Sequence, residues 1–131
     1  MHLYTLTAKR FALAIALLIF SSLVLRIYLS TIDLGSISAA LIELSRFFTV
    51  LTNFFVMVIM FRIAWAKRTP RTSTVSAFVM SLTGVGLVYH ALLAHLWDPQ
   101  GLALLADHLV HTIAPIAALT WWLCFITRSD L

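Results

Sequence analysis

Long apolar stretches dominate the hydrophobic pattern of this chain, and short polar segments separate them. The apolar stretches cover residues 11–29, 47–66, 75–96 and 102–126. Each has about the twenty residues that an α-helix needs to cross roughly 30 Å of hydrocarbon. None shows the strict alternation of a transmembrane β-barrel strand. The pattern predicts an all-α protein, a polytopic membrane bundle of four transmembrane helices in a single domain over residues 1–131.

The composition fits a membrane protein, and the distribution of charge predicts its orientation. Of the 131 residues, 62% are hydrophobic and only 11% are charged, whereas a soluble domain of this size needs far more charge on its surface. The net charge of +4 could suit nucleic acid, but the basic residues follow the helix ends instead. Seven of the nine lie on one side of the predicted membrane: Lys9, Arg10, Arg62, Lys67, Arg68, Arg71 and Arg128. Arg26 and Arg46 lie on the other side, so the positive-inside rule predicts that both termini are cytoplasmic.

The outer segments predict surface structure rather than chemistry. Within residues 30–46, Asp33 or Ser36 could cap a short interfacial helix. Its apolar positions would be Ile37, Leu41 and Leu44. We expect the Arg26 side chain to reach the lipid headgroups, and Trp97 to anchor the outer turn at the interface.

Polar and ionisable side chains gather in the outer half of the three later helices. A charged group at the centre of a membrane helix costs roughly 2.5–3.5 kcal/mol, so such residues usually mark a functional site. With the predicted topology this half contains Thr49, Thr52, Asn53, His90, His95, Asp107, His108 and His111. We expect these side chains to face one another rather than lipid.

The fourth apolar stretch carries the most informative group, DHLVHTIAP at 107–115. Asp107 and His111 are four residues apart on one helix face, so the carboxylate could hold one imidazole nitrogen and leave the other as a base. Pro115 has no N–H, so the His111 carbonyl loses its helical partner and the helix is expected to kink. The structural alternative is a proline kink at which His108 and His111 form hydrogen bonds across the bundle.

The second and third stretches add weaker signals. A threonine such as Thr49 most often bonds its own i−4 carbonyl or joins helices. The amide of Asn53 needs several partners in hydrocarbon, and it could orient a catalytic group or donate to an oxyanion. Gly84 and Gly86 indicate close helix packing, because a nucleotide loop would need a further glycine and a preceding strand.

Three segments in this order resemble a known family: RFFTVLTNFFV at 46–56, GLVYHALLAHLWDPQGLALLADHLVHTIAPIAAL at 86–119, and Trp121-Trp122. They resemble the bacterial Pr-six-Pr type membrane proteins, which are distantly related to the androgen-induced and androgen-dependent membrane hydrolases of animals. The animal members cleave fatty acid esters of hydroxy fatty acids with a membrane threonine as nucleophile and a histidine as its partner. The resemblance implies that Thr49, in the FFT element, is the nucleophile and that His111, the second histidine of HxxHT, is the base.

The resemblance also raises a question of length. The family typically has six helices, and this sequence predicts four. The chain is then either a natural short form or a fragment of a six-helix member, and a second copy could close a cavity left open to lipid.

The sequence as a whole predicts a lipid-ester hydrolase of a cell membrane, with a bacterial inner membrane favoured, acting on fatty acyl esters from the outer leaflet. Thr49 and His111 are the predicted catalytic pair. Asp107 would orient His111, Asn53 or His90 would stabilise the oxyanion, and His108 would support the site. No metal or organic cofactor is expected. Membrane lipids and a second copy of the chain are the expected partners, and nucleic acid is not.

Two alternatives lie outside catalysis. The four histidines of the two helices could ligate a haem, for which His90 and His111 would qualify as one ligand from each helix, or could form a metal site with Asp107. In the other alternative the chain is a lipid-binding or assembly subunit, and its polar cluster holds the helices together.

Overall fold

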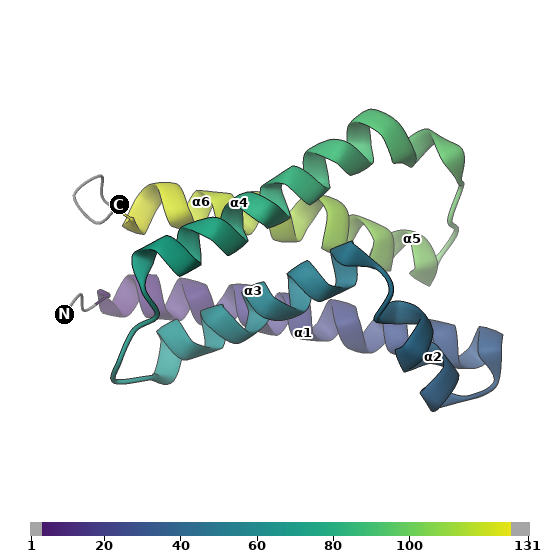
Figure 1. Cartoon of the computed structure of the whole chain (residues 1–131), viewed down its shortest axis with the longest axis horizontal. Coiled ribbons are helices and arrows are strands. Elements are labelled where there is room, and N and C mark those ends of the chain that lie inside the picture. Colours follow the sequence, from purple (N-terminus) through teal and green to yellow (C-terminus); the bar gives the residue numbers. More distant parts are fainter. Residues whose placement is uncertain (1–3, 127–131) are drawn as a thin grey trace.

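The computed structural model describes residues 4–126 and shows a bundle of long helices (Figure 1). In chain order the helices are α1 (Leu6–Leu34), α2 (Ile37–Leu44), α3 (Phe48–Trp65), α4 (Thr72–Val88), α5 (Leu102–His108) and α6 (Ala114–Phe125). Two π turns, η1 (Tyr89–Leu93) and η3 (Leu109–Ile113), and a 3₁₀ turn, η2 (Ala94–Leu96), extend them. No strand occurs in the described part of the chain.

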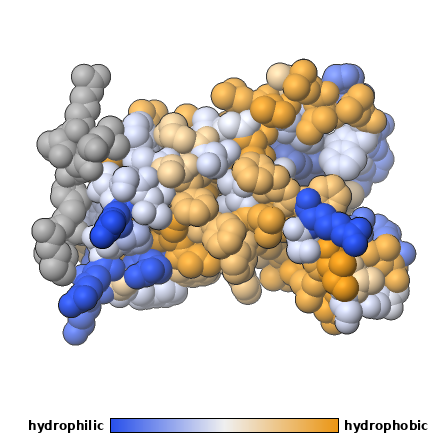
Figure 2. All heavy atoms as spheres, viewed as in Figure 1, coloured by the Kyte–Doolittle hydropathy of each residue, from blue (hydrophilic) through white to orange (hydrophobic). Residues whose placement is uncertain are grey.

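The prediction of an all-α bundle with four membrane helices is confirmed. Four continuous helical segments are long and apolar enough to cross a membrane: Leu6–Leu34, Phe48–Trp65, Thr72–Leu96 and Leu102–Phe125. The last two are continuous because η1 and η2 prolong α4, and η3 joins α5 to α6. On the face seen in Figure 2, apolar side chains cover the middle of the bundle and the most hydrophilic ones lie toward its ends.

The first helix is longer than predicted because both its ends are capped. The Thr5 hydroxyl accepts a hydrogen bond from the Ala8 N–H at 3.2 Å, so the helix starts at Leu6 rather than at residue 11. At the other end Gly35 adopts a left-handed conformation with φ of 75°, and its N–H bonds to the Thr31 carbonyl. Asp33 therefore lies inside α1 and cannot cap the next helix.

The predicted interfacial helix is present as α2. The Ser36 hydroxyl accepts from the Ala39 N–H at 3.1 Å, which makes Ser36 its N-cap. Leu44 is buried, whereas Ile37 and Leu41 are exposed on the outside of the bundle. Exposed apolar side chains on a short helix at one end of a membrane bundle suit contact with lipid.

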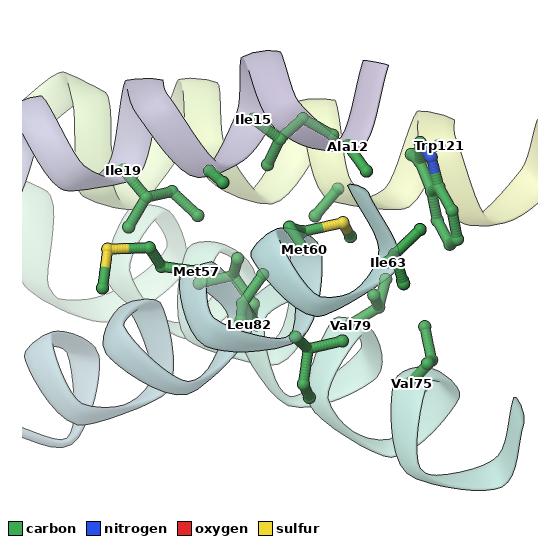
Figure 3. Close-up of a cluster of buried hydrophobic side chains, with 14 of the residues drawn as sticks. Ala12, Ile15, Ile19, Met57, Met60, Ile63, Val75, Val79, Leu82 and Trp121 are labelled. Atoms are coloured by element: carbon green, nitrogen blue, oxygen red, sulfur yellow. The ribbon is translucent and has the colours of Figure 1, made fainter. Parts of the chain in front are cut away.

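An apolar core holds the half of the bundle in which α1 begins and α6 ends (Figures 1 and 3). It includes Ala12, Ile15 and Ile19 of α1, Met60 and Ile63 of α3, Val75, Val79 and Leu82 of α4, and Trp121 of α6. Small residues on α1 let neighbouring helices approach closely, and the Trp121 indole N–H bonds to the Ala8 carbonyl at 2.9 Å. The polar residues of the predicted site lie beyond this core, toward the other end of the bundle.

Candidate functional site

The candidate site is built where the two π turns break the regular helices. In η1 the Ala94 N–H bonds to the carbonyl of Tyr89, and in η3 the Ala114 N–H bonds to that of Leu109, five residues back in each case. Such turns occur frequently at functional sites. The π turn η3 comes directly before the first turn of α6, which contains Pro115; the kink expected at this proline stays a prediction.

The predicted pairing of Asp107 with His111 is present and buried. The Oδ1 atom of Asp107 lies 3.1 Å from Nδ1 of His111, and the Asp107 carbonyl oxygen lies at the same distance from that nitrogen. Asp107 is 3% exposed and His111 7%, so both side chains are largely shielded from water. Because both neighbours of Nδ1 are acceptors, the imidazole proton belongs on Nδ1 and Nε2 is left as an acceptor.

Tyr89 and Trp97 complete a hydrogen-bonded chain around this pair. The Tyr89 hydroxyl donates to Oδ2 of Asp107 at 2.5 Å and accepts from the Trp97 indole N–H at 2.8 Å. The Tyr89 ring also stacks on the imidazole of His111, with centroids 3.7 Å apart and planes 12° apart. These contacts hold the imidazole on one face and hold the carboxylate that orients it.

A cavity of about 250 Å³ brings Thr49 and His111 together. Its lining also includes Arg26, Phe47, Val50, Tyr89, Leu93, Leu96, Trp97 and Val110. Among the described residues, no hydrogen bond engages the Thr49 hydroxyl or joins it to His111, although Thr52 one turn later bonds the Phe48 carbonyl at 2.7 Å. Since α3 begins at Phe48, Thr49 has no carbonyl of its own helix one turn behind it for its hydroxyl to bond.

Asn53 orients the site and cannot act as the oxyanion donor that the sequence suggested. Its side-chain amide donates to the Thr49 carbonyl at 2.9 Å and to the Val110 carbonyl at 3.2 Å. Both N–H groups of the amide are therefore used within the protein. Asn53 instead ties the start of α3 to the turn that carries His111.

The expectation that all the outer polar residues face one another is wrong for three histidines. His90, His95 and His108 are exposed. Nε2 of His90 lies 2.7 Å from the Thr112 hydroxyl, and this pair lines a different cavity from that of Thr49. His108 lines neither cavity, because it occupies the outward face of the helix whose inward face carries Asp107 and His111.

The sequence reasoning missed three residues that line the Thr49 cavity. The apolar pattern gives no signal for Tyr89, and it predicts that Arg26 and Trp97 lie at the lipid headgroups. Trp97 is half-exposed, as expected of an aromatic residue at the membrane interface, but its indole N–H donates a hydrogen bond to the Tyr89 hydroxyl. Nε of Arg26 is buried without a hydrogen-bond partner in the described residues. The available signal for Arg26 was its position as a lone cation inside the apolar stretch 11–29.

The haem and metal alternatives depend on how the histidines and acidic residues are placed. Within residues 4–126 no group of three histidine, cysteine, aspartate or glutamate side chains is arranged to hold a metal ion. His90 and His111 line one cavity of about 240 Å³, but Nε2 of His90 is directed to Thr112 and one face of His111 is covered by Tyr89.

Comparisons with known proteins give no match, since no family model, no curated protein and no solved structure is significantly similar to the chain. The structure therefore defines a class of protein. It is a bundle of helices long and apolar enough to span a membrane, with a buried tyrosine–aspartate–histidine cluster beside a cavity. The family resemblance of the sequence stays a prediction.

Proposed function

We propose that this protein is an intramembrane lipid-ester hydrolase in which Thr49 is the nucleophile and His111 the base. The observation that carries the proposal is a single cavity lined by both residues, with His111 held by Asp107 so that Nε2 is free to accept a proton. An unassisted threonine hydroxyl is a poor nucleophile at neutral pH, and a neighbouring base is what activates it.

The chemistry proceeds in two steps. In the first, Nε2 of His111 removes the proton of the Thr49 hydroxyl as the oxygen attacks the ester carbonyl carbon. The bond to the alcohol oxygen breaks, the alcohol leaves with the proton from His111, and an acyl-Thr49 ester remains. In the second step a water molecule gives a proton to Nε2 and attacks the acyl carbon. The bond between that carbon and the Thr49 oxygen then breaks, and the oxygen takes the proton from His111, which releases the fatty acid and restores both residues.

Arg26 is the residue best placed to stabilise the oxyanion. Its side chain lines the cavity of Thr49, and its Nε has no hydrogen-bond partner among residues 4–126. A fixed cation in a site of low dielectric lowers the energy of a developing negative charge. Asn53 has no donor left for this role, and His90 lines another cavity.

The substrate would be a fatty acyl ester. Most of the remaining cavity lining is apolar, with Phe47, Val50, Leu93 and Leu96 among its members. These side chains suit an acyl chain that enters from the lipid. With the predicted topology the cavity lies in the outer half of a cell membrane, and the bacterial inner membrane remains our proposal for that membrane.

A hydrolysis assay with matched threonine variants tests the proposal. Long-chain acyl esters would be supplied to the purified protein in lipid nanodiscs, and fatty acid release would be measured for Thr49→Val, His111→Ala and Thr52→Val. We expect a loss of about 10²-fold or more for the first two. Thr52→Val is the control, because Thr52 lies one turn away and bonds its own helix. If Thr49→Val is folded and as active as the wild type, the mechanism is wrong.

A second candidate is a non-catalytic lipid-binding or assembly subunit. Hydrogen bonds between helices favour this candidate. Asn53 donates to two backbone carbonyls, and Tyr89 donates to Asp107, as expected of side chains that hold a membrane bundle together. In that case no ester is hydrolysed, and Thr49→Val changes nothing that can be measured.

A further inference from the structure

Thr112 differs from most of the hydroxyl residues along the membrane helices. In seven of these the hydroxyl bonds the carbonyl one turn back at 2.7–2.9 Å: Ser21, Ser22, Thr31, Thr52, Ser81, Thr83 and Thr120. This is the usual state of a threonine in a membrane helix. The Thr112 hydroxyl instead meets an imidazole of another helix, with its oxygen 2.7 Å from Nε2 of His90.

The two π turns create this contact. Thr112 belongs to η3 and His90 to η1, and each turn adds a residue to a helix and so changes the direction of the side chains near it. Gly86 lets the two helices approach, since a Cβ there would lie 3.0 Å from the His111 carbonyl oxygen. The result is a hydroxyl and an imidazole within the distance that a nucleophile and its base require.

The pair opens onto its own cavity of about 240 Å³. The cavity is lined by Thr83, Gly86, Leu87, His90, His111, Thr112, Pro115, Ile116 and Leu119. Neither Thr49 nor Arg26 is in this lining. His90 is exposed on the outside of the bundle, so in a membrane this cavity would be reached from the lipid.

We propose that Thr112 and His90 form a second nucleophile–base pair, which takes acyl esters from the lipid side of the bundle. With its own proton on Nδ1, His90 accepts the Thr112 proton at Nε2 while the hydroxyl oxygen bonds to the ester carbonyl carbon. The bond to the alcohol oxygen breaks, and the alcohol leaves with that proton. A water molecule then gives a proton to Nε2 of His90 and attacks the acyl carbon. The bond to the Thr112 oxygen breaks, that oxygen takes the proton back from His90, and the fatty acid is released. Thr49 does not line this cavity, and the reaction uses neither Thr49 nor the imidazole of His111, although His111 also lines the cavity.

Covalent labelling separates the two sites. The whole chain in phosphatidylcholine nanodiscs would be treated with a long-chain alkyl fluorophosphonate, which bonds an activated hydroxyl oxygen through phosphorus and releases fluoride. Mass spectrometry of the peptides then locates the adduct. We expect an adduct on Thr112 in the wild type and in Thr49→Val. His90→Gln should slow its formation about 10²-fold, whereas Thr120→Val, a membrane threonine bonded to its own helix, should label at the wild-type rate.

Each outcome decides between the pairs. An adduct on Thr49 alone overturns the second pair and supports the first, and an adduct on Thr112 alone does the reverse. No adduct on protein that keeps its helix content by circular dichroism overturns both. Labelling of Thr112 that His90→Gln does not slow shows that the 2.7 Å contact is only a structural hydrogen bond. Locating the adduct in the wild-type protein tests the proposal without any variant that could fail to fold.

Discussion

Tyr89 makes the contacts on which the geometry of the candidate site depends. Its ring covers one face of the His111 imidazole, and its hydroxyl lies between the Trp97 indole and the Asp107 carboxylate. A carboxylate with so little exposure to water is costly unless its oxygens are paired. Tyr89 supplies the hydrogen bond to Oδ2, whereas Oδ1 lies 3.1 Å from the imidazole Nδ1 and has no hydrogen bond among the described residues.

At the scale of one residue, Tyr89→Phe should weaken both stability and catalysis. The stacked ring stays, but Oδ2 of Asp107 loses its donor, and a buried unpaired acceptor costs about 1–3 kcal/mol. We expect a lower melting temperature and slower ester hydrolysis, because Asp107 no longer has a fixed position beside His111. The control is Tyr28→Phe, since Tyr28 is exposed. An unchanged melting temperature and rate in Tyr89→Phe would show that the hydroxyl has no such role.

Contacts along one helix could be predicted from the sequence, and contacts between helices could not. The spacing of Asp107 and His111 fixes their common face, and the structure places them in contact. The pairs Tyr89 with Asp107 and His90 with Thr112 depend on how two helices are rotated against each other. That rotation follows from the π turns, which the apolar pattern does not reveal.

At the scale of the elements, the crossing of α4 with α6 determines where His111 lies. Pro115 has no N–H for the His111 carbonyl, and Gly86 packs directly against that carbonyl and the proline ring. A Cβ at Gly86 would lie 3.0 Å from the carbonyl oxygen and 3.2 Å from Cβ and Cγ of Pro115. The backbones can approach this closely because the glycine has no side chain.

Gly86→Ala should therefore separate these helices, and Gly84→Ala should not. The added methyl group meets backbone and a proline ring, neither of which can move away as a flexible side chain would. We expect Gly86→Ala to lower the melting temperature and the rate of hydrolysis. A Cβ at Gly84 has nothing within 4 Å, so Gly84→Ala should be neutral or gain up to about 1 kcal/mol from helix propensity. Equal effects of the two variants would contradict this account of the crossing.

The helices themselves were predictable, while some of their ends were not. The apolar stretches predicted all four membrane helices, and the predicted helix over residues 102–126 agrees closely with the observed one, Leu102–Phe125. The first helix extends further because Thr5 and Gly35 cap it outside the apolar stretch. Ser36 rather than Asp33 caps α2, because the chain stays helical through Asp33.

At the scale of the whole molecule, stability and candidate chemistry occupy different halves of the bundle. The apolar core lies toward the start of α1 and the end of α6, and the polar cluster lies toward α2 and α5 (Figure 1). The α3–α4 turn, which carries Lys67, Arg68 and Arg71, lies at the core end. The orientation of the bundle in the membrane remains a prediction from these charges.

Single-cysteine labelling tests that orientation. Cys124 is exposed, so the background would be Cys124→Ser, to which Gln100→Cys or Ser73→Cys is added. Both positions are exposed, Gln100 between η2 and α5 and Ser73 at the start of α4. A membrane-impermeant maleimide should label Gln100→Cys in intact cells and Ser73→Cys only after permeabilisation. The reverse pattern would place the cavity of Thr49 in the inner half.

Trapping the acyl intermediate tests the central claim most directly. The protein would be mixed with a long-chain acyl ester, quenched with acid during turnover, and its peptides examined by mass spectrometry. The account predicts an acyl group on Thr49 that is absent in His111→Ala. Turnover with Thr49 unmodified at every quench time, and the acyl group on another residue, would contradict it.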